Sequence, residues 1–200
     1  MFIQVFQGKV ADEAAARRTL ERWRDELMPG ATGFLGSTTG VATDGTLIGV
    51  ARFDSRDAAM ANSGRPEQDV WWAEMEKSFD GDVTFMECED ARAVLGGGSD
   101  DAHFVQVMEG RSDDLARMRQ IMTSHEDELH AGRPEVLGGV LMDAGDGRYV
   151  NVFYFASEAE ARTGEQLDYP EEIRAEIEEG MALMGEVSYF DLREPLLISP

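Results

Sequence analysis

Cysteine, lysine and histidine are scarce in this chain of 200 residues. Cys88 is the only cysteine, so the chain forms no internal disulfide, and its strand-like neighbours predict a buried apolar role. Lys9 and Lys77 are the only lysines. The three histidines do not have the sequence spacing, relative to cysteines or carboxylates, that is typical of a metal site. We therefore expect neither a metal nor a cofactor.

Positive charge of any kind is in short supply. Eighteen Lys and Arg residues face 40 Asp and Glu residues, which gives a net charge of −22. Nucleic-acid backbones and anionic membranes need clustered cations, so neither is an expected partner. The first residues, Met1-Phe2-Ile3, do not show the basic-then-apolar pattern of a signal peptide, so none is expected. The sequence has no apolar run that could span a bilayer, and Gly96–Gly98 lacks the following Lys-Ser/Thr of a phosphate-binding loop. We expect a cytoplasmic protein.

The chain does contain an internal repeat. Phe2–Lys9 reads FIQVFQGK, and Phe104–Arg111 reads FVQVMEGR. The offset of 104 − 2 = 102 holds without a gap as far as Ala59 and Ala161. It becomes 185 − 81 = 104 where GDV recurs as GEV, which marks a two-residue insertion in the second copy of a duplicated unit. The sequence predicts a first repeat over residues 1–95, a flexible Gly/Ser/Asp linker over 96–102 and a second repeat over 103–200.

Each copy has the pattern strand, helix, strand, strand, helix, strand. The first helix is expected from Asp12 to Leu27, because Ala16, Leu20, Trp23 and Leu27 share one face. The expected strands are 2–7, 34–39, 46–53 and 83–88, and in the second copy 104–109, 136–142, 148–155 and 187–192. Asp-Gly pairs at 44–45 and 146–147 indicate hairpins, and Ser55 and Ser157 indicate helix N-caps.

This order predicts an α+β fold, the ferredoxin-like β-α-β-β-α-β, with an antiparallel sheet and both helices on one face. The stretch 149–155 is apolar on both faces, so it needs cover on both. The equivalent sheet of the other repeat would provide that cover. We therefore expect two repeats packed sheet to sheet as an intramolecular, pseudo-dimeric α+β barrel, which is a monomer or a weak homodimer.

The sequence resembles the dimeric α+β barrel superfamily, and within it the antibiotic biosynthesis monooxygenase-like group. The residues that carry the resemblance are Met28-Pro29-Gly30, then Gly33–Gly36, and Phe53-Asp54-Ser55 ahead of a helix, with their counterparts near Gly132, Leu137 and Phe155. The resemblance implies a pocket between sheet and helices, and members that include cofactor-independent monooxygenases acting on aromatic, polyketide-like substrates.

Two departures from this group bear on function. The haem-degrading relatives use a histidine on the second helix, and neither 55–79 nor 157–184 contains one, which argues against haem degradation. The tryptophan common at the end of the third strand is missing, and Arg52 and Tyr154 stand there instead.

His125 is the candidate catalytic residue. It replaces Trp23 on the helix face that meets the sheet, where an imidazole could take a phenolic or enolic proton. The alternative is a core histidine hydrogen-bonded to a neighbour, such as Asn151 or a tyrosine.

The candidate ligand-binding residues come from both copies. Gln106, like Gln4, interrupts an apolar strand and either orients a ligand or forms a structural hydrogen bond. The second copy has Asn151 for Gly49 and Tyr154 for Arg52, so its interior is expected to be more polar. The full set is Trp23, Arg52, Trp71, Trp72, Gln106, Asn151 and Tyr154.

Trp72 aligns with a charged residue, Arg174 or Glu176, and is expected to lie away from the sheet-facing core. It would cover a pocket mouth or contact another protein, or it would lie flat against its own surface near Arg65.

Three functions fit this reading of the sequence, and the resemblance places first a small-molecule enzyme like the cofactor-independent monooxygenases that act on aromatic or polyketide-like substrates. An open cavity that reaches His125 would favour an enzyme that deprotonates an aromatic substrate. An open apolar cavity without titratable groups would favour a non-catalytic module that binds a small apolar or aromatic molecule. Filled cavities in both repeats would favour a structural protein.

Overall fold

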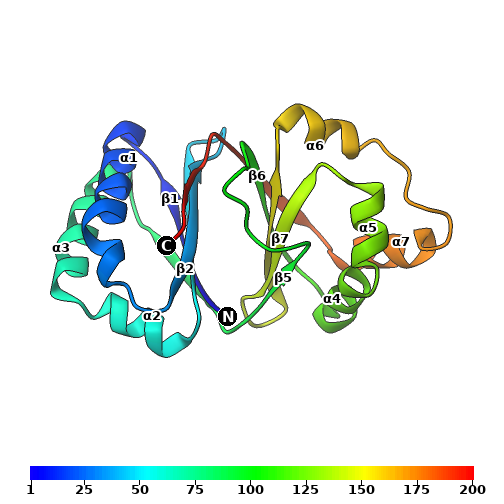
Figure 1. The fold of residues 1–200 in the computed structure, drawn as a ribbon, viewed down its shortest axis with the longest axis horizontal. Helices are drawn as coiled ribbons and strands as arrows, with labels where there is room; N and C mark the ends of the chain where they lie inside the picture. The colour runs from blue at the N-terminus through cyan, green and yellow to red at the C-terminus, as the bar shows by residue number, and fades with distance from the viewer. The chain divides into compact units, whose positions relative to one another are not determined.

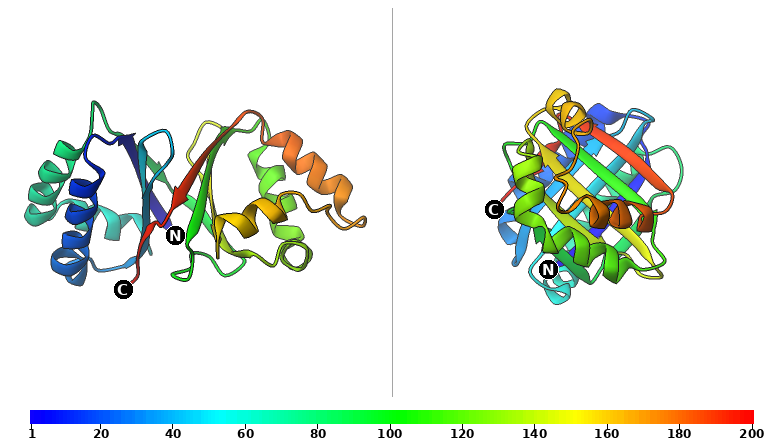
Figure 2. Two further views of the ribbon diagram at one scale, coloured as in Figure 1. Left: turned by 90° about the horizontal axis from the view of Figure 1, so that it is seen from above. Right: turned by 90° about the vertical axis from the view of Figure 1, so that its right-hand side faces the viewer.

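The computed structural model describes residues 1–200, which form two compact units (Figure 1). The first unit consists of Met1–Glu89 and Glu194–Pro200, and the second of Asp90–Arg193. Each unit is one five-stranded antiparallel sheet with helices on one face (Figures 1 and 2). The predicted α+β fold of two ferredoxin-like repeats is confirmed, and the face-to-face packing of the two sheets stays a prediction.

The first unit has the strand order β10-β2-β3-β1-β4. Its strands are β1 (Phe2–Lys9), β2 (Phe34–Val41), β3 (Thr46–Phe53), β4 (Thr84–Cys88) and β10 (Leu196–Ile198). Its helices are α1 (Glu13–Arg22), α2 (Arg56–Ser63) and α3 (Pro66–Met75), with a π-helical segment (Trp23–Leu27) and 3-10 turns (Met28–Gly30 and Glu76–Ser78).

The second unit has the strand order β5-β7-β8-β6-β9, which repeats the first unit strand for strand. Its strands are β5 (Asp90–Val94), β6 (Phe104–Arg111), β7 (Val136–Asp143), β8 (Arg148–Phe155) and β9 (Val187–Arg193). Its helices are α4 (Leu115–Ser124), α5 (Glu126–Gly132), α6 (Glu158–Gly164) and α7 (Arg174–Leu183).

The predicted helix and turn signals act as expected. The Asp12 carboxylate accepts a hydrogen bond from the Ala15 amide at 2.9 Å, which begins α1, and Asp114 begins α4 in the same way. The Ser157 hydroxyl accepts from the Glu160 amide at 3.2 Å, which caps the N-terminus of α6, and it donates to the Glu160 carboxylate at 3.0 Å. Gly45 turns the first hairpin at φ +81°, a conformation that favours glycine.

Two short strands, β5 and β10, are absent from the predicted pattern. β4 is followed after one residue by β5, which pairs with β7 of the second unit. β9 is likewise followed by β10, which pairs with β2 of the first unit. The chain therefore changes units at residues 89–90 and 193–194, and the predicted linker, residues 96–102, lies inside the second unit between β5 and β6.

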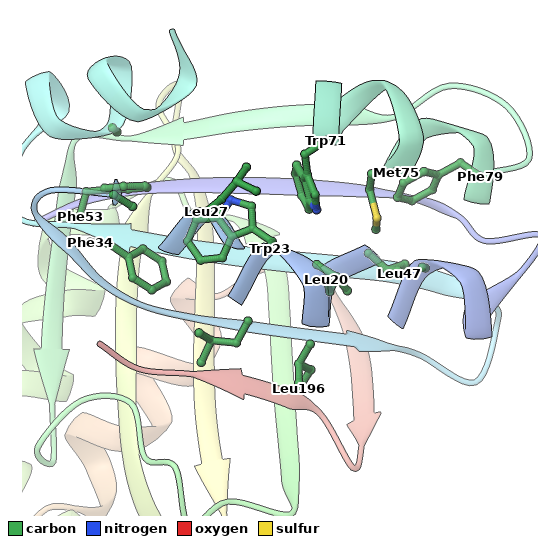
Figure 3. Packing of buried hydrophobic residues seen from close by; sticks show 14 of the residues in the cluster. Leu20, Trp23, Leu27, Phe34, Leu47, Phe53, Trp71, Met75, Phe79 and Leu196 are labelled. Carbon is green, nitrogen blue, oxygen red and sulfur yellow. The ribbon is translucent and has the colours of Figure 1, made fainter. Parts of the chain in front are cut away.

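The core of the first unit lies between its sheet and its helices. Figure 3 shows Leu20, Trp23 and Leu27 from the α1 region beside Trp71 and Met75 from α3. The sheet contributes Phe34, Leu47, Phe53 and, from the last strand of the chain, Leu196 and Ile198. None of the helices combines the length and the apolar character that crossing a bilayer requires.

Candidate functional site

The first unit encloses an open cavity of about 280 Å³ between its sheet and its helices. Known small-molecule sites span roughly 300–1,000 Å³, so this cavity lies near the lower end of that range. Aromatic rings dominate the wall. They are Phe6, Trp23, Phe34, Phe53, Trp71, Trp72 and Phe85.

Trp23 is positioned by the π-helical segment that it begins, a wider helical turn often found at functional sites. Its ring meets the ring of Phe34 edge to face at 4.9 Å. Its Nε1–H donates to the Gln68 side-chain oxygen at 2.8 Å, which ties α1 to α3 across the cavity. The Gln68 side-chain carbonyl therefore accepts the hydrogen bond from Trp23, and the NH2 group of the same side chain remains as a donor on the cavity wall.

Trp71 is the buried tryptophan of α3, with 6 % of its surface exposed. Its Nε1–H donates to the Thr19 carbonyl of α1 at 2.7 Å, so its polar atom is satisfied inside the core. Trp23 and Trp71, both predicted from the sequence as ligand-binding residues, are therefore brought together at one cavity.

The prediction that Trp72 lies away from the sheet-facing core is wrong. Its half-buried ring meets Phe6 of β1 at 5.4 Å and Phe85 of β4 at 5.0 Å, both edge to face. Phe85 is 59 % exposed on the edge strand, so this aromatic group forms the open end of the cavity. Of the expected roles, covering a pocket mouth fits this position.

The junction between α2 and α3 forms the polar part of the wall, with Asn62, Ser63, Gln68 and Asp69. Arg65 holds this junction against the end of the α1 region, because its Nη1 donates to the Leu27 carbonyl at 2.9 Å and to Asn62 Oδ1 at 3.1 Å. Asn62 therefore has a fixed side chain on the cavity wall although it is buried.

The sheet side of the cavity depends on one small residue. Ala51 of β3 lines the cavity opposite Ser37 of β2. In the second unit the same two positions are Phe153 and Gly139, and the Phe153 ring lies so close to Gly139 that a Cβ there would be only 2.8 Å away. Phe153 therefore occupies, in the second unit, a position that Ala51 leaves unfilled in the first.

His125 does not line the cavity. It separates α4 from α5 instead of continuing one helix, and its Nε2 pairs with the Glu176 carboxylate of α7 at 2.9 Å. The neighbour that pairs with His125 is therefore Glu176, and neither Asn151 nor a tyrosine, the examples expected from the sequence. Its Nδ1 is buried without a hydrogen-bond partner. This position gives no support to a base at the cavity.

The other predicted ligand residues also lie outside the cavity wall. Arg52 and Tyr154 alternate with helix-facing residues of β3 and β8, so they point to the opposite face of their sheets. The Gln106 amide donates to Asp191 at 3.0 Å, which is a structural hydrogen bond within the second unit. In the same unit, burial raises the pKa of Tyr149 to about 12, and its hydroxyl donates to the Met184 carbonyl at 2.9 Å.

Asn151 is 1 % exposed, and neither its Oδ1 nor its Nδ2 has a hydrogen-bond partner. It lies at the centre of the second sheet between Met108 and Leu141, where the first repeat has Gly49. A buried amide without partners lowers stability by the full desolvation penalty of its atoms.

We expect Asn151→Val to raise the free energy of unfolding by about 1–3 kcal/mol, because it removes two unpaired polar atoms from an apolar row. Asn151→Ser, which keeps a polar atom there, should give little or none of this gain. Urea denaturation of both variants measures the difference. A lower midpoint for Asn151→Val would mean that the amide has partners, and the expectation would be wrong.

The cavity residues that the sequence reading missed are chiefly Ala51 and the phenylalanines around it. The signal was present, because the offset of 102 sets Ala51 against Phe153 and Ser37 against Gly139. Comparing side-chain volumes at these pairs would have located the cavity in the first copy. No cluster of three or more metal-ligating side chains is present in either unit.

The fold and the sheet–helix cavity together define a class, the two-repeat ferredoxin-fold proteins. A solved protein of Lactobacillus acidophilus described as a candidate monooxygenase matches 99 % of this chain and 95 % of its own, at a TM-score of 0.76 and 12 % identity. An anthrone oxidase-like protein matches 99 % of this chain and 92 % of its own, at a TM-score of 0.68 and 11 % identity. A Listeria monocytogenes protein is described as a ferredoxin-fold relative of antibiotic biosynthesis monooxygenases. It matches 98 % of this chain and 95 % of its own, at a TM-score of 0.50 and 11 % identity.

At such identities these likenesses establish the fold, which is the one that the sequence resemblance predicts. Comparisons with protein-family profiles and with curated proteins find no match to this sequence.

Proposed function

We propose that the first unit binds a small, planar, apolar molecule in its cavity. The observation that carries the proposal is an open cavity of about 280 Å³ whose wall is mostly apolar, includes seven aromatic residues, and comes from both the sheet and the helices. Planar ligands gain both apolar burial and ring–ring contacts from such a wall. The cavity does not reach His125, so of the functions that fit the sequence the binding module agrees best, and Asp69 is the one titratable side chain of the wall that departs from it.

The test is to copy the second unit into the first. The double variant Ser37→Gly, Ala51→Phe reproduces the Gly139–Phe153 pair, and the new ring should occupy the cavity. Binding of naphthamide, an uncharged two-ring aromatic, should weaken by about tenfold or more, which corresponds to 1.4 kcal/mol. Isothermal titration calorimetry measures it.

Ser37→Gly alone is the matched control, because it makes the same backbone change without the ring. It should bind naphthamide clearly more tightly than the double variant does, although it lacks the Ser37 hydroxyl. Equal affinity of the double variant and the control would place binding elsewhere. Ala73→Phe, at an exposed position of α3 outside the cavity wall, controls for the added ring.

Oxygenation of the bound molecule is a second candidate, which the names of the fold neighbours favour. In such a reaction the bound molecule would supply the electrons and molecular oxygen would accept them. An oxygen electrode tests it with anthrone as the substrate. Oxygen consumption that exceeds the uncatalysed rate, and that is lost in the double variant, would support oxygenation. Oxygen consumption at the uncatalysed rate would contradict it and leave the proposed binding function standing.

A further inference from the structure

We infer that the cavity of the first unit selects uncharged aromatic molecules and rejects their anions. The inference rests on the proposed binding function and adds the charge of the ligand. It follows from which groups line the cavity, which groups surround it, and what hydrogen bonds its wall can offer.

The wall contains no lysine, arginine or histidine, and its one ionisable side chain is the carboxylate of Asp69. An anion that enters a mostly apolar cavity loses hydration, and only an opposite charge or several good donors compensate for the loss. Here the only ionisable side chain in the wall has the same sign as the anion. Asp69 therefore adds repulsion to the desolvation penalty.

Several arginines of the first unit are already engaged with carboxylates. Arg22 of α1 makes two hydrogen bonds to the Glu74 carboxylate of α3, at 3.0 and 2.7 Å. Arg65 contacts Glu67 at 3.0 Å. Carboxylates likewise pair with Arg17, Arg24 and Arg56. Arg52 lies on the opposite face of the sheet, by strand alternation.

The polar groups that remain suit a neutral ligand. The Gln68 NH2 group is a donor, because Trp23 occupies only its carbonyl oxygen. Gln4 adds an amide, and Ser37 and Thr39 add hydroxyls. Amides and hydroxyls both donate and accept, so they match a neutral carbonyl, amide or phenol. The acidic protein as a whole, at −22, also disfavours the approach of an anion.

The experiment compares two probes of the same shape, naphthamide and naphthoate, at pH 7 by titration calorimetry. We expect naphthamide to bind at least about tenfold more tightly. Raising the salt concentration should narrow the gap, because ions screen the repulsion between naphthoate and the acidic protein. Asp69→Asn should also narrow it. Asp57→Asn, which removes a carboxylate of α2 outside the wall, should not.

Each outcome decides something different. Equal affinities, or tighter binding of naphthoate, would overturn the inference on charge and leave the binding function standing. Failure of both probes to bind would overturn the binding function and the inference with it. Tighter binding of naphthamide that is lost in the Ser37→Gly, Ala51→Phe variant would support both.

Discussion

A chain that ends at Arg193 is expected to lose the stability of its first unit and, with it, the cavity. Residues 194–200 carry β10, whose Leu196 and Ile198 are buried in the first core and whose Ile198 lines the cavity. Burying one aliphatic side chain contributes about 1.5–3 kcal/mol, so the two together contribute about 3–6 kcal/mol. A whole domain is stable by only about 5–15 kcal/mol.

Amide hydrogen exchange of the shortened chain measures this unit by unit. Protection should fall in β1, β2 and β3, and fall less in β6 and β8 of the second unit, whose sheet contains β5 instead. Ile198→Ala in the full chain is a milder version, and Leu197→Ala, at a half-buried neighbour, is its matched control. Unchanged protection in β2 after truncation would contradict the expectation.

Trp71→Ala is expected to destabilise the first unit by about 3–5 kcal/mol, the range for removing a large buried aromatic ring. The variant also leaves the Thr19 carbonyl without the indole N–H that donates to it at 2.7 Å. Trp72→Ala is the control, since Trp72 is less buried than Trp71 and its Nε1–H donates to the exposed carboxylate of Glu76. Its loss should lower stability much less.

Guanidinium denaturation followed by far-ultraviolet circular dichroism compares the two variants. If Trp72→Ala destabilises the protein as much as Trp71→Ala, the assignment of Trp71 to the core and of Trp72 to the cavity mouth is wrong. Trp71→Phe separates ring from hydrogen bond, because it keeps most of the apolar volume and removes only the donor.

The duplication made most of the fold predictable. One constant offset converts every turn, cap and strand signal into two independent observations, so errors in one copy are corrected by the other. The sequence analysis did not predict the strands β5 and β10, because both are short edge strands. Asp90–Val94 reads DARAV, which has little β-branched or aromatic content, and it follows β4 after a single residue.

The candidate site was only partly predictable, because a cavity depends on volume more than on polarity. The polar substitutions of the second copy, Asn151 and His125, drew attention there, whereas the cavity lies in the first copy beside Ala51. The position predicted for Trp72 was wrong because α3 and α7, the matching helices of the two repeats, do not begin at equivalent residues. α3 begins at Pro66, but α7 begins at Arg174, four residues beyond the aligned Pro170.

The two short strands also set the order in which a growing chain can complete its sheets. Ser37 of β2 pairs with Ile198, which the ribosome adds 198 − 37 = 161 residues later. Until then the edge of β2 has no partner strand and can pair with other chains. The second unit needs nothing beyond Arg193. The half of the protein that is synthesised first is therefore the half that is finished last, and the wall of its cavity is complete only when translation has passed Ile198.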